Sequence, residues 1–158
     1  MQKLIFKQGD IEDLDFVKPL WEKLNHLHLE LSQHFKSRFQ CKTWEQRKSD
    51  LILKSREIRV DYVTDGRDCI IGYCISTLDK ENEKNGEIDS IYIDEDYRKT
   101  GIGKQLMNNA VDWLILKGTE TQRLEVGAGN EQVLDFYKQF DFYPINIVLQ
   151  RIEKNLDA

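Results

Sequence analysis

Apolar residues recur with two different periods along the chain, and each change of period marks the border of an expected element. A short apolar run over residues 3–7 predicts a first strand. From residue 11 to about residue 35, apolar side chains recur every three or four positions, as on one face of a helix, and Pro19 is expected to divide this stretch into two helical pieces. Residues 43–54 begin with a capping-box pattern and predict a further helix.

The middle of the chain changes to the pattern of strands. Residues 58–63 and 69–78 are rich in branched and aromatic side chains, and the turn pair at 65–66 between them predicts a hairpin. Asn85-Gly86 marks a second expected turn. Residues 87–93 then alternate as in a strand. This alternation puts Ile88, Ser90 and Tyr92 on one face and Glu87, Asp89, Ile91 and Ile93 on the other.

The last third of the chain returns to helical spacing and then adds short strands. Residues 101–117 predict an amphipathic helix that ends at Gly118. Residues 122–126 predict a strand, Asn130 is expected to cap another helix, and residues 145–152 predict a final strand. The resulting order is strand, helices, three strands, helix, strand, helix, strand, which indicates an α/β protein.

Composition restricts the class of protein. The chain has 158 residues, of which 40% are hydrophobic and 32% charged, so we expect one globular domain over residues 1–158. Uncharged apolar runs stay well below the roughly 20 residues that cross a bilayer, and the N-terminus lacks the apolar stretch of a secretory signal. We therefore expect a cytoplasmic protein with no membrane contact.

Charge and cysteine content narrow the expected partners. Lys and Arg number 23 against 28 Asp and Glu, for a net charge of −5. This balance argues against a nucleic-acid partner and requires any anion to be bound by a local basic group. Cys41, Cys69 and Cys74 match no metal-ligand spacing, so we expect buried reduced thiols, no disulfide and no metal.

One glycine-containing loop lies between an expected strand and an expected helix. Its sequence is Arg98-Lys99-Thr100-Gly101-Ile102-Gly103-Lys104. The first turn of a helix offers unpaired N–H groups and the positive end of the helix dipole, and glycines let the backbone approach an anion closely. A diphosphate would fit there, whereas the patterns of a dinucleotide-binding loop and of a P-loop are absent. By itself, the loop is equally consistent with solvated charges.

This loop resembles a known family. Arg98-x-x-Gly101-x-Gly103 is similar to the acyl-coenzyme A loop of the GCN5-related N-acetyltransferases (GNAT), Arg/Gln-x-x-Gly-x-Gly/Ala between a strand and a long helix. Residues 87–93 resemble the strand before that loop, and Asn130 with Phe136-Tyr137 resembles the family's second motif. Asp141 departs from that motif, which usually has Gly there, but Asp tolerates a left-handed backbone.

The resemblance implies a fold and a reaction. The fold would be a GNAT-like acyl-CoA N-acyltransferase fold, with a mixed, mostly antiparallel sheet of six to seven strands flanked by about four helices. The reaction would move an acetyl group from acetyl-CoA to a primary amine by direct attack in a ternary complex, without a metal. The resemblance implies these cofactor-binding residues: Ile91, Tyr92, Ile93, Arg98, Lys99, Thr100, Gly101, Ile102, Gly103, Lys104, Asn130 and Tyr137.

Two residues are the expected catalytic groups. In the family, a tyrosine at the place of Tyr137 protonates the departing thiolate, and the structural alternative is a core aromatic residue. Glu87 is the candidate base, since an alkylamine with a pKa of about 10.4 must lose a proton before it attacks. Its alternative is a solvated carboxylate at a strand end, and Asp89 is the second candidate base.

The acceptor and the assembly stay open. A polyamine, an antibiotic, an amino acid or a protein amine would all fit a small-molecule or peptide acceptor. Relatives often form homodimers through sheet edges and the final strand, so a homodimer is one expectation. Two other functions compete with the enzyme: a non-catalytic acyl-CoA-binding sensor or regulatory module, and an anion-binding protein for another nucleotide.

Overall fold

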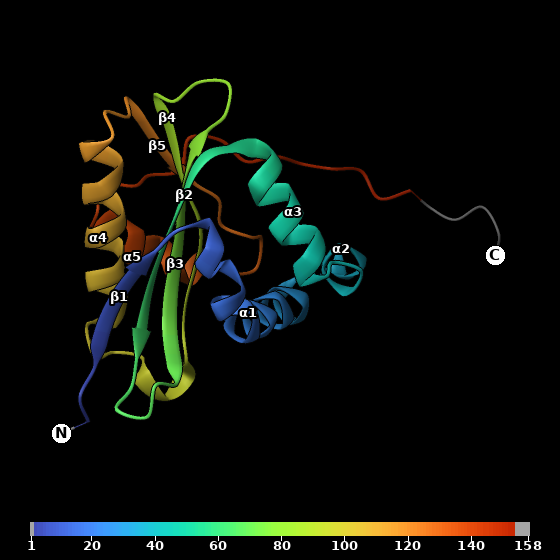
Figure 1. Cartoon of the computed structure of the whole chain (residues 1–158). Coiled ribbons are helices and arrows are strands. Elements are labelled where there is room, and N and C mark those ends of the chain that lie inside the picture. The colour runs from blue at the N-terminus through green and yellow to red at the C-terminus, as the bar shows by residue number, and fades with distance from the viewer. Residues whose placement is uncertain (1, 154–158) are drawn as a thin grey trace.

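A five-stranded mixed sheet forms the centre of the molecule in the computed structural model, which describes residues 2–153 (Figure 1). The strands follow one another across the sheet in chain order. The first four pair antiparallel, and the fifth pairs parallel to the fourth. Their bounds are Ile5–Gly9 (β1), Ser55–Thr64 (β2), Ile70–Asp79 (β3), Asn85–Ile93 (β4) and Thr121–Leu124 (β5).

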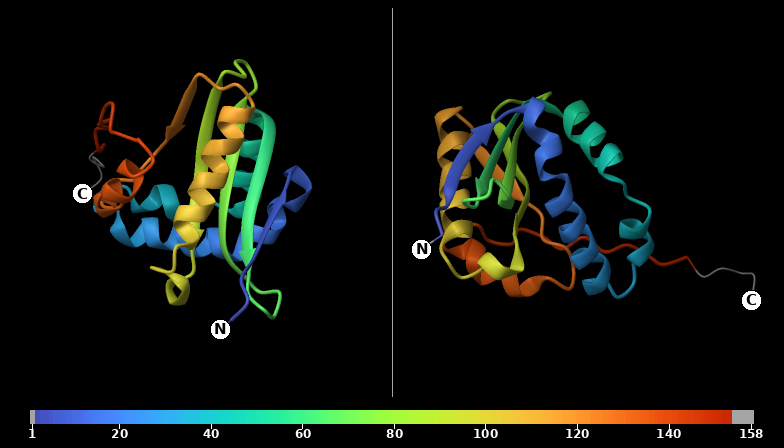
Figure 2. Two further views of the ribbon diagram at one scale, coloured as in Figure 1. Left: turned by 90° about the vertical axis from the view of Figure 1, so that its left-hand side faces the viewer. Right: turned by 60° about the horizontal axis from the view of Figure 1, so that its bottom comes forward.

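Helices cover both faces of the sheet (Figures 1 and 2). One face carries α1 (Lys18–Leu31), α2 (Lys36–Gln40) and α3 (Trp44–Lys54). The other carries α4 (Ile102–Leu116) and α5 (Leu134–Lys138). Within residues 2–153, none of the helices combines the length and the hydropathy that a membrane crossing requires.

Local signals placed the helix starts correctly. Pro19 lies in the first turn of α1, and a 3-10 helix over Ile11–Val17 precedes it, so the predicted division of this stretch is confirmed. Thr43 and Gln46 form the predicted capping box of α3: the Thr43 side chain accepts from the Gln46 N–H, and the Gln46 side chain accepts from the Thr43 N–H.

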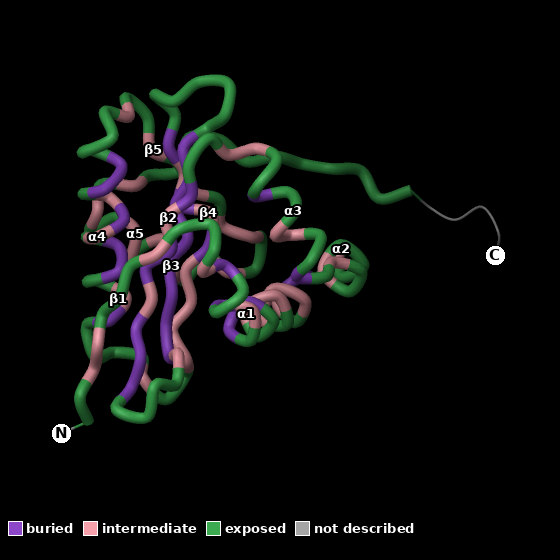
Figure 3. The backbone as a smooth tube through the Cα atoms, in the orientation of Figure 1, coloured by how far each residue is buried: buried purple, intermediate pink, exposed green. Residues whose placement is uncertain are grey.

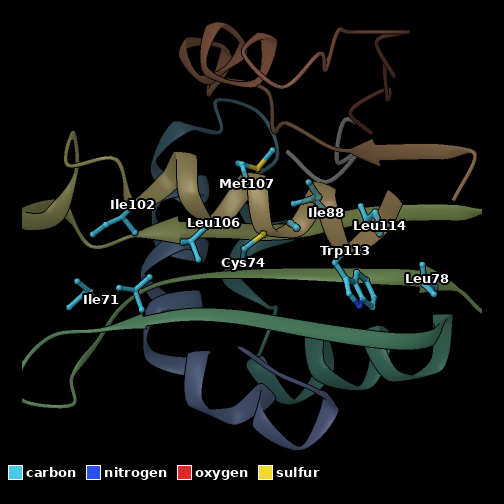
Figure 4. Close-up of a cluster of buried hydrophobic side chains, with 11 residues drawn as sticks. Ile71, Cys74, Leu78, Ile88, Ile102, Leu106, Met107, Trp113 and Leu114 are labelled. Carbon is cyan, nitrogen blue, oxygen red and sulfur yellow. The ribbon is translucent and has the colours of Figure 1, made fainter. Parts of the chain in front are cut away.

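Two hydrophobic clusters lie on opposite faces of the sheet. Figure 3 shows the buried backbone following β2 and β3 through the middle of the molecule. The α4-side cluster joins β3 and β4 to α4 through Cys74, Ile88, Leu106, Met107 and Leu114, among others (Figure 4). The α1-side cluster packs residues of the first helices, such as Trp21, Trp44 and Leu51, against Val60, Tyr73 and Ile75.

A buried ion pair lies on β2. The Arg59 guanidinium donates from Nε to Asp61 Oδ2 at 3.0 Å and from a terminal nitrogen to Asp61 Oδ1 at 2.9 Å. The Asp61 side chain is only 2% exposed, and the Arg59 side chain is 21% exposed. Burial raises the pKa of the Asp61 carboxyl, and the guanidinium opposes that rise.

The turn predicted at Asn85-Gly86 is wrong. Both residues belong to β4, and the connection from β3 turns before them, where the Asn85 N–H donates to the Asn82 carbonyl. Gly86 is buried because α4 packs directly on it, and a Cβ there would lie 2.6 Å from Leu114 Cδ2. This glycine provides room for a close approach between strand and helix.

The final strand predicted over residues 145–152 is also wrong. The structure contains no strand there, so the described sheet has five strands instead of six to seven. Five apolar side chains of this segment are exposed: Ile145, Ile147, Val148, Leu149 and Ile152. The pattern was that of a strand, but no sheet edge or helix in the described chain covers it.

The expectation of three buried cysteines is correct for only one of them. Cys74 is fully buried in β3, whereas Cys41 and Cys69 are exposed. Cys41 follows α2, and Cys69 lies in the β2–β3 turn, where its N–H donates to the Asp65 side chain. Both positions are loop positions that a hydropathy pattern does not distinguish from strand interiors.

Candidate functional site

The loop between β4 and α4 is braced by its own polar groups. The Arg98 Nε donates to the Ile93 carbonyl at 3.0 Å, and its guanidinium carbon lies 5.2 Å from the centre of the Tyr92 ring. The Thr100 hydroxyl donates to the Tyr97 carbonyl at 2.5 Å. These contacts fix the loop against the C-terminal end of β4.

The first turn of α4 is open to an anion. Gly101 is the N-cap with φ at +86°, a left-handed conformation that glycine adopts without steric cost. No side chain of the described chain caps the first N–H groups of this helix. A Cβ on Gly103 would lie 3.3 Å from Ile93 Cδ1 and 3.4 Å from Phe136 Cζ, so β4 and α5 pack close to this turn.

The same end of β4 lacks a neighbour on its β5 side. β4 and β5 pair only from Asn85–Ile88 to Thr121–Leu124. Beyond Ile88, no described strand pairs with β4 on that side, while β3 continues to pair on the other. Two carbonyls of this stretch accept from side chains, that of Asp89 from Arg47 and that of Ile93 from Arg98, and the remaining backbone groups that face away from β3 have no strand partner and can pair with a ligand.

A β-bulge changes which residues of β4 share a face. Ser90 lies opposite Ile75 and Ile88 opposite Ser76, which leaves Asp89 as the extra residue. Ile88, Ile91 and Ile93 consequently pack with the α4-side cluster. The Ser90 hydroxyl instead bonds Tyr73, whose side chain belongs to the α1-side cluster. The strict alternation predicted for residues 87–93 is wrong, because Ile88 and Ser90 are on opposite faces.

The two candidate bases converge on one lysine at the end of α3. Lys54 Nζ lies 2.8 Å from Glu87 Oε2 and also bonds Asp89 Oδ1. Asp89 Oδ2 accepts from the Thr77 hydroxyl at 2.5 Å, and its side chain is not exposed at all. Glu87 remains 36% exposed. Of the two carboxylates, only Glu87 is accessible to a substrate.

Tyr137 lies on the other face, close to the free part of β4. It packs with the α4-side cluster, which includes Cys74, and Cys74 lies opposite Ile91 in the sheet. Its hydroxyl makes no hydrogen bond to any residue from 2 to 153. Burial raises the pKa of the phenol to about 12, so this group is protonated at neutral pH.

The second motif is formed by a short turn and a short helix. Asn130 occupies the N-cap position of a 3-10 turn at Glu131–Val133, but its side chain caps no backbone N–H and instead accepts from Gln132. The predicted capping role is therefore wrong. Asp141 has φ at +63°, as expected for the residue that replaces the usual glycine.

The structure distributes most of the predicted site residues along β4. The loop of residues 98–104 is at its C-terminal end, Tyr137 packs beside its unpaired part, and Glu87 is near its start. Asn130 instead follows a loop whose Gly127 and Gly129 pack against α1. The sequence analysis missed Lys54, Arg47 and Thr77, which contact the candidate bases. The one available signal was the predicted end of a helix at Lys54, shortly before the strands.

Comparisons with known proteins agree with this geometry. The sequence pattern of the acetyltransferase (GNAT) family matches residues 21–142. A curated relative from Methanocaldococcus jannaschii, described as an uncharacterized N-acetyltransferase, is 34% identical over 68 residues. That match spans 43% of this chain and only 30% of the relative.

Solved structures share the whole fold. An aminoglycoside acetyltransferase from an uncultured soil metagenomic sample, solved with trehalose, is 18% identical, with 96% of each chain covered and a TM-score of 0.64. An aminoglycoside N-acetyltransferase solved with CoA is 13% identical, with 98% of this chain and 97% of that chain covered and a TM-score of 0.66. The expected α/β fold class is confirmed.

Proposed function

Because the chain belongs to the acetyltransferase (GNAT) family, we propose that it transfers an acetyl group from acetyl-CoA to a primary amine, with residues 1–158 acting as one domain. The observation that carries this proposal is the open first turn of α4 beside the unpaired end of β4. The helix turn suits a diphosphate, and the free backbone suits the amide groups of the pantetheine arm.

The residues around this turn fit the cosubstrate. In this proposal, the diphosphate lies at Arg98, Lys99, Thr100, Gly101, Ile102, Gly103 and Lys104, and the arm follows Ile91, Tyr92 and Ile93 toward Asn130. The loop's three cations supply positive charge in a chain whose net charge is −5. Gly101 lets the backbone turn into the helix with its N–H groups exposed.

The chemistry is a direct transfer between two bound substrates. The amine nitrogen attacks the thioester carbonyl, so a C–N bond forms and the C–S bond breaks. Glu87 takes the amine proton, directly or through water, and Tyr137 gives a proton to the departing sulfur. Burial raises the pKa of Tyr137 to about 12, so its phenol carries the proton that it donates at pH 7.

The test is amine-dependent release of free thiol from acetyl-CoA. The amine panel contains a polyamine, an aminoglycoside, free amino acids and a peptide with a lysine and a free N-terminus. We expect at least one amine to accelerate thiol release. Gly101→Ala should raise KM for acetyl-CoA about 10-fold, because an L-residue at positive φ costs roughly 1–2 kcal/mol in the binding turn.

Gly118→Ala is the matched control for that variant. Gly118 also has positive φ, at +79°, and open space around its Cβ position, but it lies beyond the other end of α4. The control should lose similar stability and keep its KM. Equal KM values in both variants would remove the loop from cosubstrate binding. Saturable CoA binding without turnover of any amine would favour the acyl-CoA-binding sensor.

We also propose that the protein forms a homodimer through residues 145–152. Extended backbone with five exposed apolar side chains is typical of a strand that pairs with another chain. Light scattering should give twice the monomer mass for the unaltered protein and the monomer mass for Leu149→Asp. Asn146→Asp adds the same charge in the same segment and should remain dimeric. A monomeric unaltered protein would refute the dimer.

A further inference from the structure

We propose that Lys54 is a positioning residue for acetyl transfer, whose ammonium ties the Glu87 carboxylate to the buried Asp89 side chain and holds Glu87 oriented on the α1-side face of the sheet. This inference rests on the proposed function, in which Glu87 accepts the amine proton. It adds a residue that lies on a different element from both candidate bases.

The geometry supports a fixed lysine. Lys54 is the last residue of α3, and its Nζ bonds both carboxylates at once. Asp89 is the anchor, since it is fully enclosed and also accepts from Thr77 at 2.5 Å. Arg47, two turns earlier on α3, donates to the Asp89 carbonyl at 3.1 Å and holds the bulge itself.

The two carboxylates meet one lysine because they are two residues apart on β4 and share a face of the sheet. The side chains of Glu87 and Asp89 both reach Lys54. Asp89 cannot serve as the base while Lys54 and Thr77 occupy its two oxygens. Glu87 uses only Oε2 for Lys54, and its partial exposure leaves Oε1 available to an amine or a water molecule.

The charge of the Lys54 ammonium depends on the two carboxylates that it contacts. Burial alone would lower the pKa of the Lys54 ammonium, but the Asp89 charge and the hydrogen bonds to both carboxylates raise it, so the ammonium is charged at neutral pH. Burial raises the pKa of the Asp89 carboxyl, and Lys54 opposes this rise. The other charged or titratable groups that face this pair or neighbour it are Arg47 on α3, Cys74 and Asp79 on β3, and Arg123, which lies opposite Glu87 on β5.

Removing the lysine leaves two carboxylates on one face, with the Arg47 guanidinium 3.8 Å from Asp89 and Arg123 opposite Glu87 on β5. The pair would then share a proton at higher pH than before. A protonated pair cannot accept the amine proton at the acid end of the working range. Removal of the lysine should therefore lower the rate of acetyl transfer and also move the acid side of its pH profile to higher pH.

The experiment compares pH profiles of kcat and kcat/KM for Lys54→Met, Lys54→Arg and Lys84→Met. Lys84 is a matched control, because it forms an exposed ion pair with Glu120 and its loss changes the net charge equally. In Lys54→Met, we expect kcat at pH 7 to fall about 10-fold and the acid limb to move up by about one pH unit. Lys54→Arg should restore most of both, and Lys84→Met should match the unaltered protein.

Two readouts separate the possible failures. Absence of amine-dependent thiol release in the unaltered protein would refute the proposed function. An active protein whose Lys54→Met variant keeps the acid limb in place would overturn the role of Lys54, even if its rate falls. Where the panel contains no substrate, carboxyl NMR decides: an Asp89 titration midpoint that does not rise in folded Lys54→Met also overturns it.

Discussion

Replacing Tyr137 with phenylalanine should lower kcat about 100-fold and leave CoA binding within about threefold, because a positioned general acid contributes roughly 10²- to 10⁴-fold. The substitution removes one oxygen from a residue whose ring packs in the α4-side cluster and whose hydroxyl bonds no residue from 2 to 153. The fold therefore keeps its packing, while the sulfur loses its proton donor. Steady-state kinetics with a saturating amine, together with calorimetry of CoA, measure the two effects.

The pH dependence of Tyr137 has a defined sign. Burial raises the pKa of its phenol to about 12, so the proton that it donates is present throughout the range from pH 6 to 10. Any basic limb below pH 10 should therefore persist in Tyr137→Phe. Tyr143→Phe is the control, since Tyr143 is 63% exposed, and its kcat should not change. An unchanged kcat in Tyr137→Phe would exclude the phenol as the acid.

Replacing Arg59 with methionine should destabilise the protein by about 3 kcal/mol at pH 7, since breaking a buried ion pair leaves an uncompensated charge. Domains of this size are stable by roughly 5–15 kcal/mol, so the loss is large. The Asp61 carboxyl, only 2% exposed, would then be buried without its guanidinium partner. Urea denaturation at pH 7 measures the change in the free energy of unfolding.

The loss should shrink on acidification. Burial already raises the pKa of Asp61, and removal of Arg59 raises it further, so the folded variant holds a proton that the unfolded chain releases near pH 4. Between that pH and the raised folded value, stability falls as pH rises, and the deficit should be smaller at pH 5 than at pH 7. Arg59→Met with Asp61→Leu should recover most of the loss. An equal deficit at both pH values would show that the charge is not the cause.

The parts of the fold that the sequence predicted well depend on neighbouring residues. The capping box at Thr43, the division at Pro19 and the β2–β3 hairpin all follow from contacts within a few positions. The wrong turn at Asn85-Gly86 has a tertiary cause, because Gly86 is required by the approach of α4 and not by a turn. Residues 145–152 have the pattern of a strand, but the pattern does not indicate whether a neighbouring strand is available for pairing.

In the candidate site too, the sequence predicted the contiguous part and missed contacts between distant residues. The loop from Arg98 to Lys104 is contiguous, so its glycines and cations could be recognised from the sequence. The contact from Lys54 to Glu87 joins residues 33 positions apart, and that from Arg47 to Asp89 joins residues 42 positions apart. Period-two alternation places Glu87 and Asp89 on one face, but it does not indicate which residues of α3 lie against that face.

The short pairing of β5 sets how firmly the last part of the chain is held. Only four residues of β5 pair with the sheet, and the segment that follows, up to Phe142, is held by aromatic side chains in the α4-side cluster and by the packing of Gly127 and Gly129 against α1. Such a segment can detach as a cooperative unit at a smaller free energy than global unfolding. Its amides should exchange with solvent faster than those of β2 and β3, and a ligand that bridges β4 and α5 would slow that exchange.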